Sequence, residues 1–273
     1  MYATSPLRYS ENRGNRCTQW TWQWVPLTCR LGRRRSLTEQ DSVLEARAAL
    51  LSALDSSRDG LDAIARLGRL CVDLLPVDGA SISLMADADI RETLYASDEV
   101  VARIDAVQFS LGEGPCFEAF QTRRPVLVAD LHAASTAWPV FATEMINEPA
   151  GAIFAFPLIS GAISLGAMDL YREQPGWLSA DEVAIALQTV DIVTLAVLEM
   201  QTNVVDQPWW TDLPTSRGQV HQATGMLIAE FGISAAHALA RLRGYSFTTG
   251  RLVDEVADDL VARRLTPADL EQP

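Results

Sequence analysis

The chain has 273 residues, which is enough for one large domain or for two of ordinary size. Hydrophobic residues make up 48% of it, which allows a packed core and excludes a chain that is disordered throughout. The net charge of −13 is spread unevenly along the chain. Residues 1–40 contain seven Arg and two acidic residues, residues 41–205 contain nine Arg and 24 acidic residues, and residues 206–273 contain six Arg and nine acidic residues. No uninterrupted apolar run reaches the roughly 18 residues of a membrane span, so we expect a protein that does not enter a membrane.

The four cysteines indicate neither a metal site nor a disulfide framework. Cys17, Cys29, Cys71 and Cys116 form no CxxC pair, and no His stands at the spacing of a zinc ligand. Scattered cysteines in a chain of this length are typical of reduced thiols. We therefore expect a cytoplasmic protein without a bound metal, and the sequence identifies no cofactor.

Residues 1–40 differ from the rest of the chain. Three tryptophans alternate with polar residues between positions 20 and 24, and a basic run, Arg33–Arg35, follows. Because no second segment is available to pair with a strand here, we expect a disordered N-terminal extension, which a start near Leu37 or Val43 would omit. The alternative is a basic and aromatic arm that binds nucleic acid or a membrane.

The segment 41–205 mixes helical and strand patterns. A capping-box pattern at Ser42–Glu45 predicts a helix start, and apolar residues three or four apart predict a second helix from Leu61 to Leu75. Further helices are predicted over 117–120, 138–147 and 180–204, the last opened by a capping box at Ser179–Glu182. Alternating or continuous apolar runs predict strands over Ala80–Met85, Thr93–Ser97, Ala106–Ser110, Val126–Ala129, Ala152–Ile159 and Ala162–Tyr171.

The last two of these strands are joined by Ser160-Gly161, which is a hairpin signal. Helices that alternate with short strands and end in a hairpin favour an α+β fold, with helices packed against a largely antiparallel sheet.

From Ser216 onward the pattern is purely helical. The Pro- and Trp-containing stretch 206–215 is the predicted linker. Beyond it, Gly232 is expected to end a first helix and Ser234 to cap a second. The three apolar faces lie in Val220–Phe231, Ala235–Leu242 and Leu252–Val261. Three short helices with one apolar face each predict a small all-α bundle over 216–273.

This helical segment resembles an ANTAR domain. The resemblance is carried by Val220–Ile228, Gly232–Ser234, Ala238–Arg243 and Leu252–Ala257, which run through all three helices in order. It implies a regulator that binds paired RNA stem-loops in nascent transcripts and prevents formation of a terminator hairpin. The chain departs from the family at Thr224, where members often carry Lys.

The expected RNA contacts lie on the same segment, because RNA affinity depends largely on cations that displace condensed counterions. Arg241 and Arg243 flank Leu242, which points to the core, so we expect both to project outward. The alternative is that these arginines are solvated or pair with nearby acidic residues. The other predicted RNA-contacting residues are His221, Thr224 and Arg251.

Residues 41–205 resemble a GAF domain. The resemblance is carried by Ala80–Met85, Leu111–Phe120, Pro125–Asp130 and the hairpin Ile153–Leu170. It implies a sensory or dimerising module with varied small ligands, and we expect ligand contacts from Cys116, Phe117 and Phe120. A helix start lowers the pKa of a thiol, so Cys116 is either a reactive sensor or a small buried residue.

The predicted helix 181–204 carries more apolar side chains than one sheet face requires. An exposed apolar surface of this size normally binds a partner, so we expect a homodimer through this helix.

Two hypotheses for the function follow. The first is a transcription antitermination regulator that binds RNA stem-loops under the control of a GAF sensory domain. The alternative is a dimeric small-ligand-binding or scaffolding protein whose ANTAR module does not bind RNA. We expect no enzyme, because the chain has no GxSxG and no HExxH, and Gly112-Glu-Gly114 lacks the further Gly and the Lys of a phosphate-binding loop.

Overall fold

The structure is a computed structural model and describes residues 37–87, 90–133, 137–202 and 217–271. We call residues 37–202 the sheet region and residues 217–271 the helical module. The predicted linker 206–215, and residues 1–36 of the predicted N-terminal extension, lie outside the described residues.

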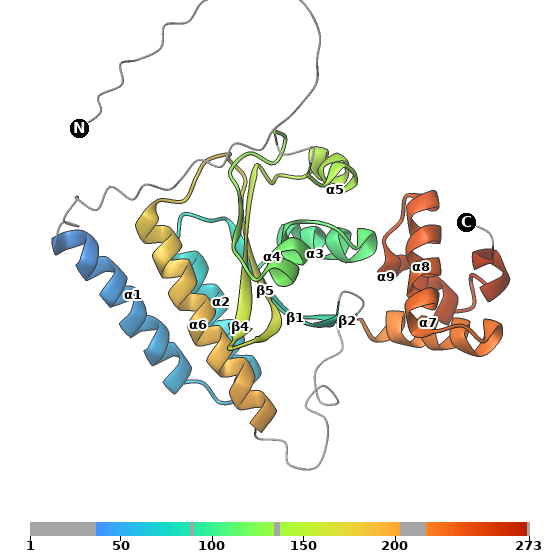
Figure 1. Cartoon of the computed structure of the whole chain (residues 1–273), viewed down its shortest axis with the longest axis horizontal. Helices are drawn as coiled ribbons and strands as arrows, with labels where there is room; N and C mark the ends of the chain where they lie inside the picture. The colour runs from blue at the N-terminus through green and yellow to red at the C-terminus, as the bar shows by residue number, and fades with distance from the viewer. Residues whose placement is uncertain (1–36, 88–89, 134–136, 203–216, 272–273) are drawn as a thin grey trace, which may run out of the picture. The chain divides into compact units, whose positions relative to one another are not determined.

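The sheet region is built on an antiparallel sheet of five strands in the order β2-β1-β5-β4-β3 (Figure 1). The strands are β1 (Gly79–Asp87), β2 (Ile90–Ala96), β3 (Val126–Val128), β4 (Ala152–Ser160) and β5 (Ile163–Arg172). The hairpin from β4 to β5 turns at Gly161, whose φ of 59° favours glycine. The predicted α+β fold with an antiparallel sheet is therefore confirmed.

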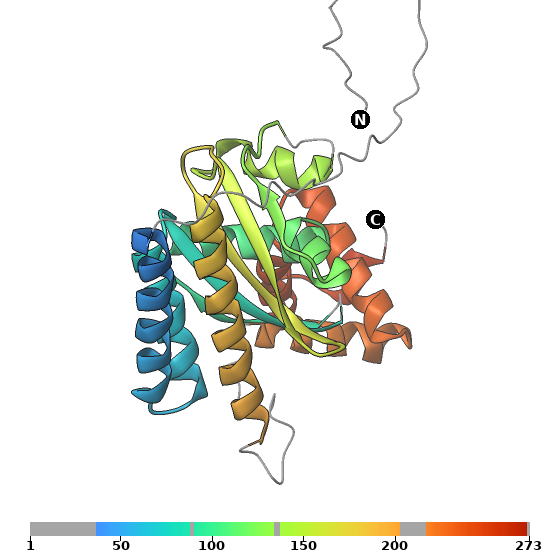
Figure 2. The same cartoon turned by 60° about the vertical axis from the view of Figure 1, so that its left-hand side comes forward.

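Two helices, α2 (Gly60–Leu74) and α6 (Ala180–Thr202), cover one face of this sheet, and α1 (Leu37–Asp55) packs against both of them on the same side (Figures 1 and 2). Their apolar side chains form a core with the strands, in which Ile64, Leu67 and Phe156 are fully buried.

The two predicted capping boxes have different outcomes. At α6 the Ser179 hydroxyl accepts the N–H of Glu182 at 3.3 Å, and the Glu182 carboxylate accepts the N–H of Ser179 at 2.6 Å. The prediction at Ser42–Glu45 is wrong, because α1 begins earlier, at Leu37. A helix start that sequence reasoning places by one motif shifts when helix-forming residues continue upstream of it.

Among the described residues, α6 is long and apolar enough to cross a membrane, with a mean hydropathy of 1.8 over Ala180–Met200. The bent pair of helices 218–231 and 235–249 passes the same test together. The sequence analysis predicted this helix but not its mean hydropathy, because acidic residues interrupt its apolar run. Half of the α6 stretch is buried inside the fold.

The opposite face of the sheet carries shorter helices. They are α3 (Glu99–Leu111), α4 (Pro115–Thr122), α5 (Pro139–Glu144) and the 3-10 turn η1 (Met145–Asn147). The helical prediction over 138–147 is thus confirmed.

The predicted strand over Ala106–Ser110 is wrong, because these residues belong to α3. The carboxylate of Asp98 accepts the N–H groups of Val100 and Val101 at 2.8 and 3.0 Å, which starts the helix upstream of the predicted strand. Gly112, with a φ of 68°, ends it. An alternation of only five residues does not separate a strand from a helix.

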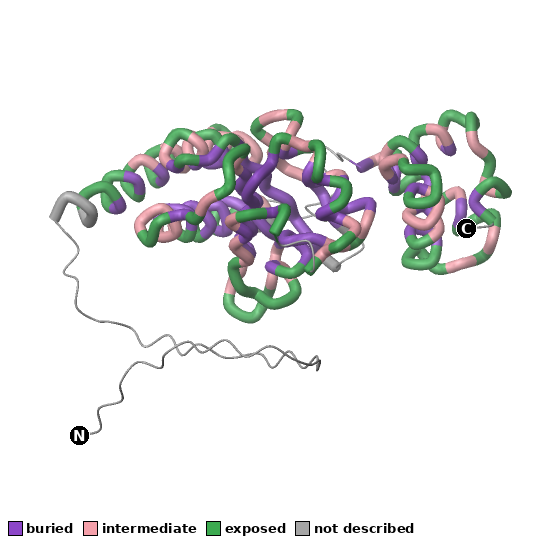
Figure 3. The backbone as a smooth tube through the Cα atoms, turned by 90° about the horizontal axis from the view of Figure 1, so that it is seen from above, coloured by how far each residue is buried: buried purple, intermediate pink, exposed green. Residues whose placement is uncertain are grey.

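The helical module consists of α7 (Gly218–Phe231), α8 (Ala235–Thr249), α9 (Val253–Val261) and the 3-10 turn η3 (Pro267–Leu270). Gly232 ends α7 with a φ of 62°, and the hydroxyl of Ser234 accepts the N–H of His237 at 3.3 Å to cap α8, both as predicted. Buried positions recur along the inner sides of these helices (Figure 3). Ile228 is exposed instead, so it is not part of the predicted apolar face.

Candidate functional site

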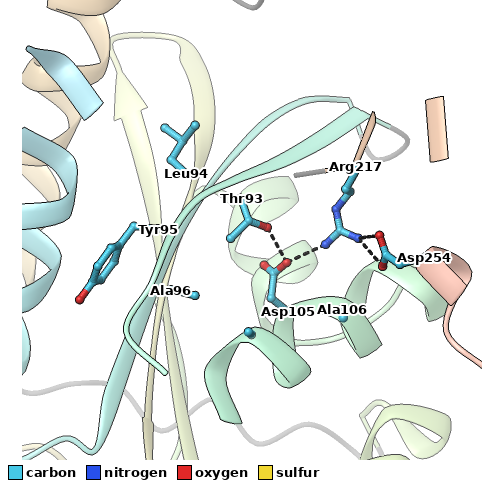
Figure 4. Close-up of a pocket in the computed structure, with 9 residues that line it drawn as sticks. Thr93, Leu94, Tyr95, Ala96, Asp105, Ala106, Arg217 and Asp254 are labelled. Carbon is cyan, nitrogen blue, oxygen red and sulfur yellow. Dashed lines mark hydrogen bonds and ion pairs between the residues drawn. The ribbon is translucent and has the colours of Figure 1, made fainter. Parts of the chain in front are cut away.

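Arg217 joins the helical module to the sheet region through buried ion pairs (Figure 4). It stands at the N-terminal cap of α7, and its side chain is 4% exposed. Its Nη2 lies 2.7 Å from Oδ2 of Asp105 on α3, and its Nη1 lies 3.0 Å from Oδ2 of Asp254 on α9. The guanidinium carbon lies 3.8 Å from the ring centroid of Phe109. One cation therefore binds α3 and α9 at the start of α7.

Asp105 lies between two guanidinium groups and is itself buried. Its carboxylate also binds Arg91 of β2 and accepts hydrogen bonds from the hydroxyls of Ser83 at 2.8 Å and Thr93 at 2.7 Å. Burial alone would raise the pKa of Asp105, but the charges of Arg91 and Arg217 hold that pKa below its ordinary value. The carboxylate is therefore ionised at neutral pH.

A second buried carboxylate, Asp169 of β5, lies 3.8 Å from Arg91. It accepts a hydrogen bond from the side-chain amide of Gln108 at 2.8 Å, and the amide oxygen of Gln108 accepts the N–H of Cys116 at 2.8 Å. Burial raises the pKa of Asp169 to about 6, although Arg91 opposes the rise. We call five charged residues the buried ion network, although the last of them is partly exposed: Arg91, Asp105, Asp169, Arg217 and Asp254.

Phe109 of α3 is part of the hydrophobic core of the helical module. Its ring is 2% exposed, and the guanidinium carbon of Arg243 lies 5.3 Å from the ring centroid. Arg243 Nε also donates to the carbonyl oxygen of Phe109 at 3.1 Å. The neighbouring Ser110 hydroxyl accepts the N–H of Val253 at 2.9 Å. The end of α3 therefore contacts both α8 and α9.

His221 and Thr224, two predicted RNA-contacting residues, lie on α7. The Nε2 of His221 lies 2.6 Å from the carboxylate of Glu92 on β2, and the His221 side chain is 48% exposed. The hydroxyl of Thr224 donates to the carbonyl of Val220 at 2.7 Å, within its own helix. His221 is thus oriented by the sheet region, whereas Thr224 is not.

The three predicted arginine contacts lie in different surroundings. Arg241 lies over the ring of Phe231, 4.4 Å from its centroid, and Arg251 binds Asp259 at 2.7 Å. Arg241 and Arg243 are both half-buried, so the expectation that both project outward together is wrong. Each packs on a different aromatic ring, and their contact with RNA stays a prediction.

The predicted ligand-contacting residues of α4 are packed inside the sheet region. Cys116 and Phe117 are buried in a cluster with Met85 and Ala167, and Phe120 packs against it. Burial raises the pKa of the Cys116 thiol well above its ordinary value. The alternative of a reactive thiolate at this helix start is therefore wrong, because desolvation outweighs the effect of the helix terminus.

Two cavities described in the structure lie beside contacts between the sheet region and the helical module. One, of about 360 Å³, is lined by Thr93, Tyr95, Asp105, Arg217 and Asp254 among others (Figure 4). The other, of about 280 Å³, is lined by residues of α3, α5 and α8, including Arg243 and Phe247. Cys116, Phe117 and Phe120 line neither. The described residues hold no group of three or more side chains suited to a metal ion.

Sequence reasoning missed Asp105, Phe109 and the pairing of Arg217. A signal was present: once 99–111 is recognised as a helix, Asp105 interrupts an apolar face that includes Val101 and Ile104. An acidic residue there requires a buried cation as partner. The wrong strand prediction over 106–110 concealed this.

Comparison with known proteins shows two family matches. A model described as GAF domain matches residues 58–197, and one described as ANTAR domain matches residues 214–261. No curated protein matches the chain.

Several solved structures are similar to the sheet region. The GAF domain of a phosphoenolpyruvate-protein phosphotransferase from Coxiella burnetii is 14% identical, with 60% of this chain and 96% of that chain covered and a TM-score of 0.50. The corresponding domain from Acinetobacter is 12% identical, with 62% and 99% covered and a TM-score of 0.44. Free methionine-R-sulfoxide reductase from Neisseria meningitidis, in complex with its substrate, is 12% identical, with 61% and 92% covered and a TM-score of 0.46. The likeness to the first of these shows the fold alone.

Proposed function

Because the chain belongs to the proteins that join a GAF domain to an ANTAR domain, we propose that it is a transcription antiterminator whose helical module binds RNA under the control of the sheet region. ANTAR domains bind RNA in antitermination and GAF domains are sensory, so the chain is a regulator of this general kind.

The observation that carries the proposed control is the buried ion network. If Arg217 leaves Asp105, Asp105 keeps Arg91 and Arg217 keeps Asp254, but each of the two buried charges loses one of its partners. Leaving one charge of a buried ion pair in the interior without its partner costs several kcal/mol of free energy, whereas moving both charges into water costs less. A signal that changes the position of α3 therefore changes the contacts of α7 directly, which is the physical requirement for coupling between two sites.

The proposed RNA partner is a pair of stem-loops in a nascent transcript. The contacts are expected from His221, Thr224, Arg241, Arg243 and Arg251. Unpaired bases of an RNA loop stack on the plane of an arginine guanidinium group, and RNA phosphates bind the N–H groups at its edge. Arginines on short helices therefore suit this partner.

We also infer a homodimer through α6. Leu44 of α1 is 62% exposed and Leu195 of α6 is 51% exposed, and Leu51 and Leu187 add to the exposed apolar side chains of these two helices. A second copy of the same face would cover them. Two protein modules related by a two-fold axis match two adjacent stem-loops.

Ligand binding, catalysis and location complete the proposal. We expect a small molecule as the signal, and the cavity of about 360 Å³ beside Arg217 is of a size that such ligands occupy. We expect no catalytic reaction, in keeping with the protonated, buried thiol of Cys116. We expect the chain to act in the cytoplasm, where nascent transcripts are made.

The test is an electrophoretic mobility shift with stem-loop pairs from the host transcriptome, measured over a range of salt. Binding should weaken as salt rises, with a logarithmic slope of roughly −0.7 to −0.9 per phosphate contact. Absence of a shift with every RNA tested, at low salt and with the purified chain folded, would contradict the proposal.

One observation favours the alternative, a dimeric small-ligand-binding or scaffolding protein that does not bind RNA. Several arginines of the helical module are already paired with carboxylates of the chain: Arg217 with Asp105 and Asp254, and Arg251 and Arg264 with Asp259. A folded dimer that binds a small ligand and no RNA would support this second function.

A further inference from the structure

The helical module holds the end of α3 in a way that matches the chemistry of a nucleotide. Resting on the proposed function, we propose that the face of the helical module that now holds α3 is the RNA site. This face binds one unpaired nucleotide of an RNA loop, whose base stacks against Arg217 and Arg243 and whose phosphate binds Arg217. In this structure α3 occupies that site in place of RNA.

The first argument is that basic side chains of this face bind oxygen atoms of the sheet region. Carboxylate and phosphate oxygens are alternative acceptors for the same guanidinium fork. A face that binds such oxygens from a protein helix is therefore suited to the RNA backbone. The three contacts are Arg217 with Asp105 at 2.7 Å, His221 with Glu92 at 2.6 Å, and Arg243 with the carbonyl of Phe109 at 3.1 Å.

The second argument is the aromatic ring that lies among these acceptors. The guanidinium carbons of Arg217 and Arg243 lie 3.8 and 5.3 Å from the centroid of Phe109. The same ring packs against the apolar core of α7, α8 and α9. Unpaired RNA bases are commonly recognised by stacking on guanidinium planes and apolar side chains. Phe109 therefore fills the position of a base, and the carboxylate of Asp105 fills that of a phosphate.

The third argument is the contrast with other arginines of the module. Arg251 and Arg264 both bind Asp259 of α9, and Arg241 lies over Phe231 of α7. These described contacts stay inside the module. Among the contacts that the structure describes, Arg217 and Arg243 hold groups from outside the module, on the face toward α3, and Arg217 also binds Asp254 within it.

It follows that α3 and RNA compete for the same atoms. Because α3 belongs to the same chain, its effective concentration at the face is in the millimolar range or above. The opposite side of α3 packs on the sheet region through Val101, Ile104 and Val107, so α3 stays there when the helical module moves off. Asp105 would then keep Arg91 as its partner, while Arg217 would keep Asp254 on Nη1 and bind phosphate through Nη2, the nitrogen that now binds Asp105.

The experiment measures the affinity of the full chain for a synthetic pool of RNA stem-loops with randomised loops. Phe109→Ala removes the ring that occupies the base position and leaves every residue of the helical module itself unchanged. It should tighten RNA binding about 5- to 150-fold, the usual range for coupled sites. In that background Arg243→Ala should abolish the gain, because this arginine is expected to contact the loop base that takes the place of the ring.

Two matched controls separate this from general loosening of the fold. Val107→Ala removes a buried apolar side chain of the same helix that packs in a core cluster with residues of the sheet region, and RNA affinity should stay unchanged. Arg263→Ala removes an equal charge from an exposed position of the module and should weaken binding less than Arg243→Ala does.

A second variant covers the case in which Phe109→Ala does not fold, as judged by circular dichroism. Glu92→Gln removes one carboxylate at the edge of the contact and keeps its shape, and it should tighten binding about two- to fivefold.

An RNA loop that carries 2-aminopurine reports stacking directly: its fluorescence should fall on binding to Phe109→Ala and recover when Arg243 is also replaced.

The outcomes are distinct. A folded Phe109→Ala chain that binds RNA no more tightly than the wild type overturns the inference and leaves the proposed function standing. Self-association of that variant without tighter RNA binding also overturns it, because the face is then a protein interface. If neither the wild type nor any variant binds any RNA of the pool, the proposed function itself has failed, and this inference with it.

Discussion

The two faces of the sheet are packed in different ways. Against α2 and α6 the contact is apolar, and the buried hydroxyls of Thr189 and Thr194 bond to carbonyls of their own helix at 3.0 and 2.7 Å. Against α3 the same sheet presents Ser83, Arg91 and Asp169. The pleat of the strands separates the two sets, because successive side chains point to opposite faces.

This difference separates stability from communication. Apolar contacts are non-directional and tolerate small shifts between helix and sheet. A buried ion pair stabilises only one arrangement of its partners, and its net contribution to stability is often small. We therefore attribute the stability of the sheet region chiefly to the α2 and α6 face, and the docking of the helical module to the face of α3.

The largest expected effect comes from Asp105→Ala. This change leaves Arg91 and Arg217 buried without their shared carboxylate, so we expect the free energy of unfolding to fall by about 3–5 kcal/mol. Urea denaturation measures the loss, and hydrogen exchange should rise in α7 and α9. Asp62→Ala, which breaks the partly exposed pair with Arg66, is the control and should lower the free energy of unfolding only slightly. A similarly small loss for Asp105→Ala would show that the network does not hold the fold.

Leu67→Ala tests the apolar face of the comparison. Leu67 of α2 is fully buried in the core, so the truncation should lower the free energy of unfolding by about 2–5 kcal/mol. Hydrogen exchange in α7 and α9 should change only as far as global unfolding requires. If exchange in the helical module rises selectively, the apolar face also controls docking and the division drawn above is wrong.

The pH dependence of the free energy of unfolding also distinguishes the two faces of the sheet. The pKa of Asp169 is raised to about 6 in the folded chain, above the roughly 3.9 of an unfolded Asp, so the folded state binds the proton more tightly. Stability should therefore fall as the pH rises from about 4 to 6, by an amount on the order of 1–3 kcal/mol. The lowered pKa of Asp105 acts in the opposite sense, but only as the pH falls below about 4.

Asp169→Asn isolates this contribution. The Asn oxygen can still accept the hydrogen bond that Gln108 donates, while the titrating proton is gone. Thermal melts at pH 4, 5, 6 and 7 should show a weaker slope between pH 4 and 6 for the variant than for the wild type. An unchanged slope would assign the pH dependence to other groups.

The sequence was informative where local pattern and tertiary packing agree. The hairpin of β4 and β5, the cap at Ser179 and the end of α7 at Gly232 each rest on contacts between near neighbours in the chain. The contact between Arg217 and Asp105 spans 112 residues, and its geometry depends on how two separate parts of the chain pack. Periodicity does not encode such a pairing, so the candidate site could be predicted only as a set of cations on helices.

The smallest expected effect on stability, and the sharpest on assembly, belongs to Leu195→Arg. Leu195 is half-exposed on α6, so an arginine there loses little packing and should leave the melting temperature nearly unchanged. If a second copy covers this face, the charge would be buried without a partner and the dimer should dissociate. Sedimentation at micromolar concentration measures this, with Ile163→Arg at the exposed start of β5 as the control. A monomeric wild type would contradict the homodimer itself. A variant that remains dimeric would place the dimer contact elsewhere and leave the apolar face of α6 with a purely internal role.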